Sequence, residues 1–175
     1  MSMIAYDLCC GSGGWAAGLI EAGYHVIGYD ISPQPDYPGE FRLADVKTLS
    51  GADMRDGVLI VASPPCEEFS RHQMPWTRKR NPPPPDLSIA EACWRIAREA
   101  GLPVVMENVR AAQGWFGRAV AHVGPFYLWG DVPAILPRPV VRKKESYGSK
   151  DRLKRARVPI ELAKWVGECF SDGAA

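Results

Sequence analysis

Short apolar runs recur through the first half of the chain, and each is followed by glycine, proline or an acidic residue. Four of these runs have the length and composition of strands buried in a sheet: residues 3–9, 25–29, 41–44 and 58–62. Residues 15–22 predict a short helix between the first two runs. Residues 88–100 predict a longer helix, which opens with the capping-box sequence Ser88-x-x-Glu91. Strands that alternate with helices predict an α/β fold, with a mostly parallel sheet and helices on both faces.

The second half continues the same alternation. Residues 103–106 predict a fifth strand, residues 116–123 a helix, and residues 126–135 a last strand or hairpin. Pro159 suits the first turn of a final helix that is expected to run to about Phe170. All of this fits one domain spanning residues 1–175, because the chain is of ordinary single-domain length.

Polar and reactive residues stand where the predicted strands end. They are the glycine cluster 11–14, Asp30, Asp45, Pro64-Pro65-Cys66 and Glu107-Asn108. Ligands of parallel sheets bind beyond the carboxyl ends of the strands. We therefore expect these residues to share one edge of the sheet and to form a single site there.

Composition narrows the setting of the protein. Hydrophobic residues make up 46% of the chain and charged residues 23%, as in ordinary globular proteins. No apolar run approaches the ~20 residues of a membrane helix, and the N-terminus lacks a signal-peptide pattern, so a cytoplasmic location is expected. The five cysteines are odd in number and the three histidines are scattered, so we expect neither a disulfide framework nor a metal site.

Charge is distributed unevenly along the chain. Residues 138–157 hold nine Lys and Arg against two acids, a local charge of +7, and the rest of the chain sums to −6. A second basic segment, residues 71–87, holds four basic residues and five prolines and is expected to be irregular. Such stretches suit contacts with phosphates, although a solvated surface segment is the plainer alternative for residues 138–157.

The glycine cluster and the two acids favour a ligand that contains adenosine. Glycines between a strand and a helix supply backbone amides and allow close approach. The spacing is not that of a dinucleotide or triphosphate site. Asp30 can accept the hydroxyls of a ribose and Asp45 an exocyclic amine. Taken singly, the glycine cluster is equally consistent with a plain tight turn, and each acid alone is better explained as a solvated loop acid.

Two residues can carry the chemistry. Cys66 follows two prolines that hold its backbone rigidly, and a thiol near a helix N-terminus can become a thiolate nucleophile. The other four cysteines are interpreted as small buried hydrophobic residues. Glu107 follows an apolar strand, where burial raises the pKa of a carboxyl and lets it donate a proton. Asn108 is expected to orient Glu107.

Three motifs in this order resemble the DNA cytosine-5 methyltransferases over roughly residues 3–110. They are Asp7-Leu8-x-x-Gly11-x-Gly13-Gly14, Ser63-Pro64-Pro65-Cys66-x-x-Phe69-Ser70 and Glu107-Asn108-Val109. Trp129-Gly130 and Val158-Pro159-x-x-Leu162-Ala163 look like the short phage and prophage members of that family. The resemblance implies a Rossmann-like fold for methyltransferases that use S-adenosylmethionine.

The resemblance also implies residue roles. Cys66 would attack carbon 6 of a cytosine flipped out of its stack, and Glu107 would hydrogen-bond its ring nitrogen 3, with Asn108 beside it. The cofactor, S-adenosylmethionine, would lie against Asp7, Cys9, Cys10, Gly11, Gly13, Gly14, Trp15, Asp30, Ile31, Asp45, Val46 and Pro64. DNA, duplex or single-stranded, would contact Ser70, Arg71, Arg78, Lys79 and Arg80, with residues 71–87 as a loop that closes over the substrate.

Several positions depart from the family pattern. Cys9 replaces a phenylalanine, Glu67 a glutamine, and Asp30 the usual glutamate. The Gln-x-Arg-x-Arg element that contacts cytosine is absent, as is the Gly-Asn-Ser-Val element. The candidate substitutes for the former are Arg142, Lys143 and Lys144. About 65 residues follow Glu107, which is short for the usual target-recognition domain, so we expect short or relaxed sequence specificity.

Three functions fit the sequence. The first is methylation of cytosine in DNA, with or without a separate specificity partner. The second keeps this chemistry but acts on RNA, single-stranded DNA or a free cytosine nucleotide. The third is a non-catalytic, cofactor-binding partner of a larger methyltransferase, although such a module would need neither Cys66 nor Glu107.

Overall fold

The computed structural model describes residues 3–73, 83–134, 139–140 and 157–171. They build one seven-stranded sheet in the order β3-β2-β1-β4-β5-β7-β6. Neighbouring strands run parallel from β3 to β5, and β7 runs antiparallel to both β5 and β6. The strands are β1 Met3–Leu8, β2 Tyr24–Asp30, β3 Glu40–Leu43, β4 Leu59–Ala62, β5 Val104–Asn108, β6 Ala121–Val123 and β7 Phe126–Gly130.

The order of the first five strands is the Rossmann-like order 3-2-1-4-5, which places β1 and β4 at the centre of the sheet. All four residues of β4 are buried, as expected for a strand covered on both faces. The predicted α/β class with a mostly parallel sheet is confirmed.

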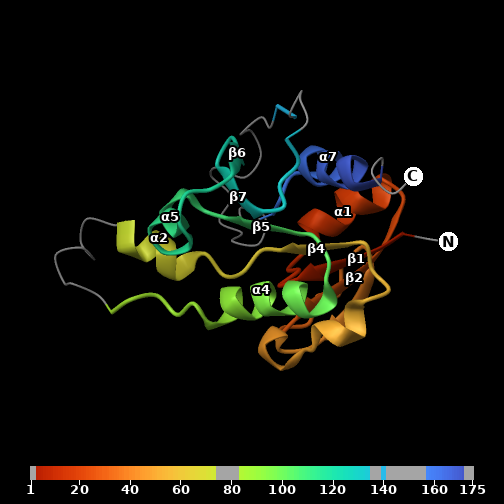
Figure 1. Cartoon of the computed structure of the whole chain (residues 1–175), viewed down its shortest axis with the longest axis horizontal. Helices are drawn as coiled ribbons and strands as arrows, with labels where there is room; N and C mark the ends of the chain where they lie inside the picture. The colour runs from red at the N-terminus through yellow and green to blue at the C-terminus, as the bar shows by residue number, and fades with distance from the viewer. Residues whose placement is uncertain (1–2, 74–82, 135–138, 141–156, 172–175) are drawn as a thin grey trace.

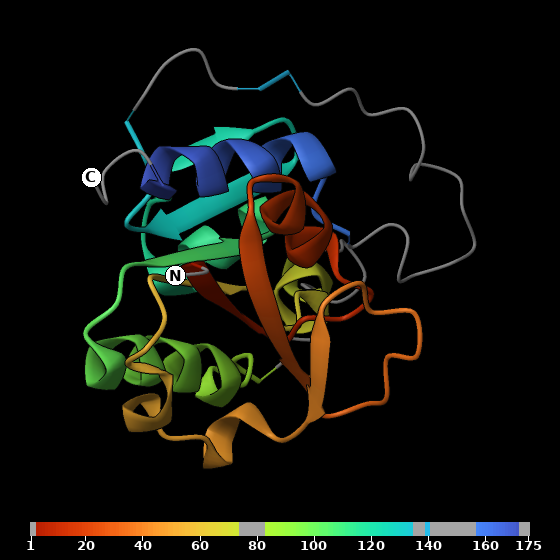
Figure 2. The same cartoon turned by 90° about the vertical axis from the view of Figure 1, so that its right-hand side faces the viewer.

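Helices cover both faces of the sheet (Figure 1). Figure 2 shows α1 (Gly14–Glu21) and α7 (Ile160–Ser171) on one face and α4 (Ser88–Ala100) on the other. Alternate strand residues enter the two cores, so Val61 and Val105 pack with α1 and α7, and Ile60 and Met106 with α4. The remaining short elements are η1 Val46–Thr48, η2 Gly51–Met54, α2 Glu67–Gln73, η3 Arg110–Ala112 and α5 Gln113–Phe116.

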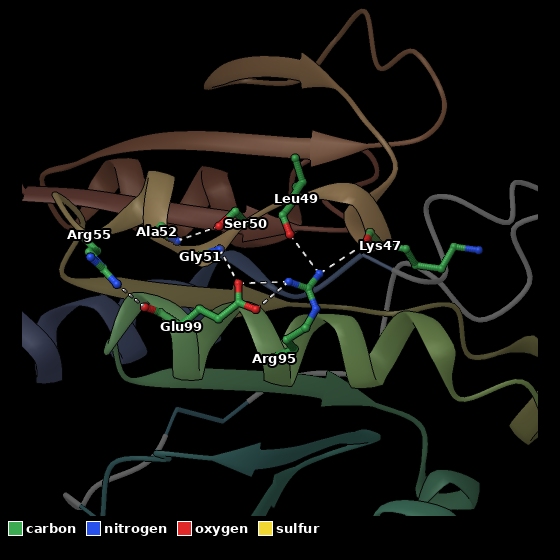
Figure 3. Close-up of polar contacts among 8 residues, drawn as sticks. All are labelled: Lys47, Leu49, Ser50, Gly51, Ala52, Arg55, Arg95 and Glu99. Atoms are coloured by element: carbon green, nitrogen blue, oxygen red, sulfur yellow. Dashed lines mark hydrogen bonds and ion pairs between the residues drawn. The ribbon is translucent and has the colours of Figure 1, made fainter.

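A polar clamp ties α4 to the segment that contains η1 and η2 (Figure 3). The Arg95 guanidinium donates to the carbonyl of Leu49 at 2.9 Å and to the Glu99 carboxylate at 3.0 Å. Glu99 in turn accepts from the amide of Gly51 at 2.9 Å. These contacts hold the pKa of Glu99 below its usual range. The clamp fixes the chain that follows Asp45, one of the residues predicted to bind a ligand.

Sequence patterns misplaced some boundaries. The expected helix 116–123 is wrong, because α5 ends at Phe116 and residues 121–123 form the edge strand β6. Gly117 adopts φ +80° and ends the helix there. Once past it, the backbone pairs with β7, a partner that local periodicity does not reveal. Glu107 and Asn108 lie inside β5, not after it.

Two further expectations need correction near α4 and α2. The capping box at Ser88 is not formed, since Ser88 is already the first helical residue and donates its amide to Asp86 Oδ1 at 2.8 Å. The expected irregular segment 71–87 begins as helix, because its first three residues belong to α2. Residues 83–87 form no helix or strand, and residues 74–82 lie outside the described part of the chain.

The helices in the described ranges are too short or too polar to span a membrane.

Candidate active site

The strand register brings the predicted site residues to one edge of the sheet. Leu8 pairs with Tyr29 on one side and with Ala62 on the other, and Ala62 pairs with Met106. The ends of β1, β2, β4 and β5 therefore lie within two residues of one another along the strand direction. The glycine turn, Asp30, the Pro64-Pro65-Cys66 turn and Glu107 follow or occupy these ends. These four groups thus share one edge of the sheet, as the sequence predicts, and their action as a single site stays a prediction.

The glycine turn leaves its backbone open at one position. Gly11 and Gly13 adopt φ +47° and +76°, and Cys9 lies in the same left-handed region at +57°. A Cβ atom at Gly11 would meet no atom within 4 Å, whereas one at Gly13 would collide with Pro38. Gly11 can therefore be approached closely by a ligand, while Gly13 serves packing against the loop after β2.

Asp30 is held by two backbone amides at the end of β2. Its Oδ2 accepts from Gly11 at 3.0 Å and its Oδ1 from Ser32 at 2.9 Å. Each carboxylate oxygen keeps a second lone pair for a ligand. The next side chain, Ile31, is 69% exposed. This part of the sheet edge thus offers a ligand three features close together: the carboxylate acceptor of Asp30, the open backbone of Gly11 and the apolar side chain of Ile31.

Asp45 makes its contacts with neighbouring residues in the chain. It lies two residues beyond the end of β3 and caps η1, where its Oδ1 accepts from the amide of Lys47 at 2.9 Å. Its Oδ2 lies 3.9 Å from Lys47 Nζ. The described structure thus explains Asp45 as a helix cap, and its predicted contact with an amine stays a prediction.

Asp7 is a fully buried carboxyl beneath the glycine turn. Its Oδ2 accepts from the Tyr37 hydroxyl at 3.0 Å, and its Oδ1 has no hydrogen-bond partner in the described part of the chain. Burial raises the pKa of Asp7 to about 8, and the nearby Asp30 adds to this, while the bond from Tyr37 opposes it. Sequence reasoning missed Tyr37, whose only signal is an aromatic residue within a proline-rich loop.

Other residues expected at the cofactor are also buried and present little side-chain surface: Cys10, Trp15, Val46 and Pro64. Burial, with the charges of Asp7 and Asp30, raises the pKa of the Cys10 thiol. The Cys9 thiol hydrogen-bonds with Cys93 of α4, and its pKa is raised by that bond and by burial. These side chains support the turn from below, and their contact with a ligand stays a prediction.

A hydrogen-bonded chain links the first helix to Glu107. The Trp15 indole donates from Nε1 to Ser63 Oγ at 3.0 Å, and Ser63 Oγ donates to Glu107 Oε2 at 3.2 Å. Trp15 is 2% exposed, so the indole end of this chain is shielded from water. Sequence reasoning missed the role of Ser63, although Ser63 belongs to the motif that contains Cys66.

Glu107 is a buried acid with a raised pKa. Burial raises the pKa of its carboxyl to about 7, and the hydrogen bond from Ser63 opposes the shift. At neutral pH a large share of Glu107 is therefore protonated and able to donate a proton or a hydrogen bond. The expected raised pKa is supported by this burial.

Asn108 orients the cysteine turn, not Glu107. Its Nδ2 donates to the carbonyl of Pro64 at 2.9 Å, and its Oδ1 accepts from the amide of Val109 at 2.9 Å. Asn108 is 1% exposed, so both bonds are internal. The expectation that it fixes Glu107 is wrong, because Ser63 is the side chain bonded to that carboxyl.

Cys66 immediately precedes helix α2. Its carbonyl accepts from the amide of Ser70 at 3.0 Å, which closes the first turn, and the residue is partly exposed. An aromatic cluster anchors α2, with the ring centroids of Phe69 and Phe116 5.0 Å apart and those of Phe116 and Trp129 5.5 Å apart. Cys66 is thus held between a fixed turn and a fixed helix. None of the five cysteines forms a disulfide.

Only part of the expected nucleic-acid contact set can be placed. Ser70 is partly exposed and Arg71 exposed on α2. Arg78, Lys79, Arg80, Arg142, Lys143 and Lys144 lie outside the described residues. Across the described ranges, no three His, Cys, Asp or Glu residues gather as a metal site would require.

Comparison with known proteins finds similarity in structure only. No protein-family model and no curated protein matches the chain. A protein described as a DNA modification methyltransferase of an E. coli prophage is 19% identical, with a TM-score of 0.46 over 63% of this chain and 33% of its own. The Dnmt2 methyltransferase of S. pombe is 19% identical, with a TM-score of 0.44 over 65% and 36%.

A third similar structure is the tRNA (uracil-54, C5)-methyltransferase of Pyrococcus abyssi, in complex with S-adenosyl-L-homocysteine. It is 16% identical, with a TM-score of 0.38 over 63% of this chain and 26% of its own. The chain thus matches only about a quarter to a third of the length of these proteins. At such identities the fold assignment rests on the strand order of the sheet.

Proposed function

We propose that this chain transfers a methyl group from S-adenosylmethionine to carbon 5 of cytosine in DNA, through a covalent adduct with Cys66. The observation that carries the proposal is the pairing of two motifs at one sheet edge. The turn that contains Cys66 also contains Ser63, whose hydroxyl bonds the buried, partly protonated Glu107. A nucleophile and a proton donor held by one turn suit attack on a ring whose nitrogen must be neutralised.

The residues that would hold the cofactor lie at and beside the glycine turn. Gly11 offers open backbone, Asp30 offers fixed acceptors for ribose hydroxyls, and Ile31 offers an exposed apolar face. These groups fit an adenosine-containing ligand. S-adenosylmethionine, when bound there, supplies an electrophilic methyl group.

The protein residues perform the remaining steps. Cys66, as a thiolate after losing its proton to solvent, forms a bond between Sγ and carbon 6. The carbon 5–carbon 6 double bond opens, and Glu107 stabilises the charge at ring nitrogen 3 by donating its hydrogen bond. Carbon 5 would then take the methyl group, and the rest of the cofactor would leave as S-adenosylhomocysteine. Loss of the carbon 5 proton to a base restores the double bond and breaks the bond to Sγ, releasing the thiolate.

The test of this proposal is transfer of tritiated methyl from S-adenosylmethionine to duplex DNA, single-stranded DNA, RNA and dCMP in parallel. Labelling of DNA supports the proposal. Labelling of RNA or dCMP alone would keep the chemistry and replace the substrate. A folded protein that binds S-adenosylmethionine but labels none of the four would instead be a cofactor-binding partner.

A trapping experiment tests the nucleophile. DNA with 5-fluorocytosine should form a covalent adduct in the presence of cofactor, because fluorine cannot leave carbon 5 as a proton does. Cys66→Ser should abolish the adduct on denaturing gels, while Cys169→Ser, on the far helix α7, should retain it. An adduct that persists in Cys66→Ser would show that Cys66 is not the nucleophile.

Calorimetry tests the cofactor site. Asp30→Ala should weaken binding of S-adenosylmethionine or S-adenosylhomocysteine by roughly tenfold or more, since it removes a charged acceptor. Asp36→Ala is the matched control, because Asp36 is an exposed acid in the loop that follows Asp30. Equal affinities of the two variants for the cofactor would show that Asp30 does not bind the ribose.

A further inference from the structure

A basic hollow opens beside the candidate active site, at the β6 edge of the sheet. It is a cavity of about 470 Å³ between η3, α5 and the β6–β7 hairpin, which lie together in Figure 1. Its polar lining comes from Arg110, Gln113, Arg118, His122 and Tyr127, and none of the residues that line it is acidic. The hollow therefore has a net positive charge that no carboxylate of its own lining offsets.

The sheet register places this hollow next to the end of β5. Tyr127 pairs with Asn108 across the β5–β7 ladder, and His122 pairs with Tyr127 across the β7–β6 ladder. Neighbouring strands lie about 4.8 Å apart, so the hollow begins one or two strand spacings, roughly 5–10 Å, from Asn108. Arg110 is three residues beyond Glu107 in the chain.

The segment that contains Arg118 is held rigidly. The Gln113 side chain accepts from the amide of Ala119 at 3.2 Å, and the Trp129 indole donates to the carbonyl of Gly117 at 3.0 Å. The amide of Val120 donates to the carbonyl of Leu128 at 2.9 Å. Arg118 therefore projects from a backbone fixed on both sides.

The guanidinium groups of Arg110 and Arg118 do not take part in holding the described part of the fold together. In the part of the chain that the structure describes, neither Arg110 nor Arg118 makes a side-chain hydrogen bond or ion pair. Beside them the rings of His122 and Tyr127 stack at 5.0 Å and 18°. Guanidinium forks match phosphate oxygens, and aromatic faces beside arginines are typical of surfaces that bind nucleic-acid strands.

We propose that Arg110 and Arg118 bind a backbone phosphate of the substrate strand next to the target cytosine. The proposal rests on the proposed function, because the target base enters at Glu107 and the strand must leave the site over a neighbouring surface. The β7–β6 end of the sheet is adjacent, basic and rigid. Neither arginine was expected from the sequence to contact nucleic acid.

The experiment measures oligonucleotide binding by fluorescence anisotropy over a series of salt concentrations. The probes are duplex DNA, single-stranded DNA and RNA, each with one cytosine, and the proteins are wild type, Arg110→Gln/Arg118→Gln and Arg98→Gln. Arg98 is an exposed arginine on α4, on a helix that does not line the hollow. The double variant should bind at least tenfold more weakly, and its salt slope should fall by up to about 0.9 on duplex or about 0.7 on single strands, because one phosphate contact is lost. Arg110→Lys/Arg118→Lys should restore most of the slope, because it keeps the charge.

A neutral methylphosphonate, placed at successive positions around the cytosine, locates the contact. One position should weaken binding to the wild type and leave the double variant unaffected, as in a double-mutant cycle. Binding of the double variant equal to that of Arg98→Gln, in a protein that transfers methyl groups, would overturn this inference and leave the proposed function intact. A protein that binds the cofactor but none of the oligonucleotides would contradict both proposals, the phosphate contact at the hollow and the nucleic-acid substrate.

Discussion

Ser63 is the residue on which the two halves of the proposed active site meet. Its hydroxyl accepts from Trp15 of α1, the helix that follows the glycine turn, and donates to Glu107 of β5. It also stands three residues before Cys66. One hydroxyl thus joins the helix after the glycine turn, the buried Glu107 and the turn that contains Cys66, and it opposes the upward shift of the Glu107 pKa.

Ser63→Ala should therefore change the pH dependence of methyl transfer. Without the hydroxyl, the pKa of Glu107 rises further above about 7. If protonated Glu107 is the active form, the loss of activity at alkaline pH shifts to higher pH, as a kcat/KM profile would record. Trp15→Phe is the control, since it removes the indole donor and keeps the bond from Ser63 to Glu107. An unchanged alkaline limb in Ser63→Ala would show that Glu107 does not act through its proton.

At the scale of elements, α1 and α7 pack through a glycine. A Cβ atom at Gly18 would lie 2.6 Å from both the Ala163 Cβ and the backbone nitrogen of Lys164. The two helices thus approach at a distance that only glycine permits. Their contact fixes α1 on the sheet and, with it, the glycine turn that immediately precedes α1.

Gly18→Ala should lower the free energy of unfolding by about 1–3 kcal/mol, because overpacking outweighs the gain of about 0.5–1 kcal/mol in helix propensity. Urea denaturation measures the difference. Gly114→Ala is the matched control, since a Cβ there meets nothing within 4 Å. A Gly18→Ala protein as stable as the wild type would mean that α1 and α7 do not pack this closely.

At the scale of the whole molecule, two buried acids make stability depend on pH. The pKa values of Asp7 and Glu107 are raised to about 8 and about 7 in the folded protein, against roughly 4 in an unfolded chain. Between about pH 4 and pH 8 the folded state therefore binds more protons than the unfolded chain. Its stability is fully present below about pH 4 and falls as the pH rises towards 8.

Asp7→Asn should flatten this decline, because the amide keeps an acceptor for Tyr37 and cannot ionise. Between pH 5 and 8 the wild type should lose at least about 1.4 kcal/mol more than the variant, the equivalent of one pKa unit. Urea titrations at pH 5, 6.5 and 8 measure this. Asp36→Asn, at an exposed position, should keep the wild-type slope. Parallel pH curves for Asp7→Asn and the wild type would show that Asp7 titrates normally.

Local patterns were enough to predict most of the sheet. The runs predicted at 3–9, 25–29, 58–62 and 103–106 became β1, β2, β4 and β5 within one or two residues at each end. Strands of this kind are specified by contiguous apolar residues and by the glycine or proline that stops them, and both signals are local. The helix expected at 116–123 failed because β6 exists only through its pairing with β7.

The order of residues along the chain predicts which chemical groups reach the carboxyl edge of the sheet, because each stands at the end of a strand whose direction the α/β alternation dictates. Which of these groups contact one another follows from the packing of the folded chain. Glu107 is bonded to Ser63 and not to its neighbour Asn108, and Asp7 is bonded to Tyr37, 30 residues away. The physical reason is that hydrogen-bond partners across a sheet depend on register and on which face each side chain enters. Register and facing arise only when the strands and loops pack together.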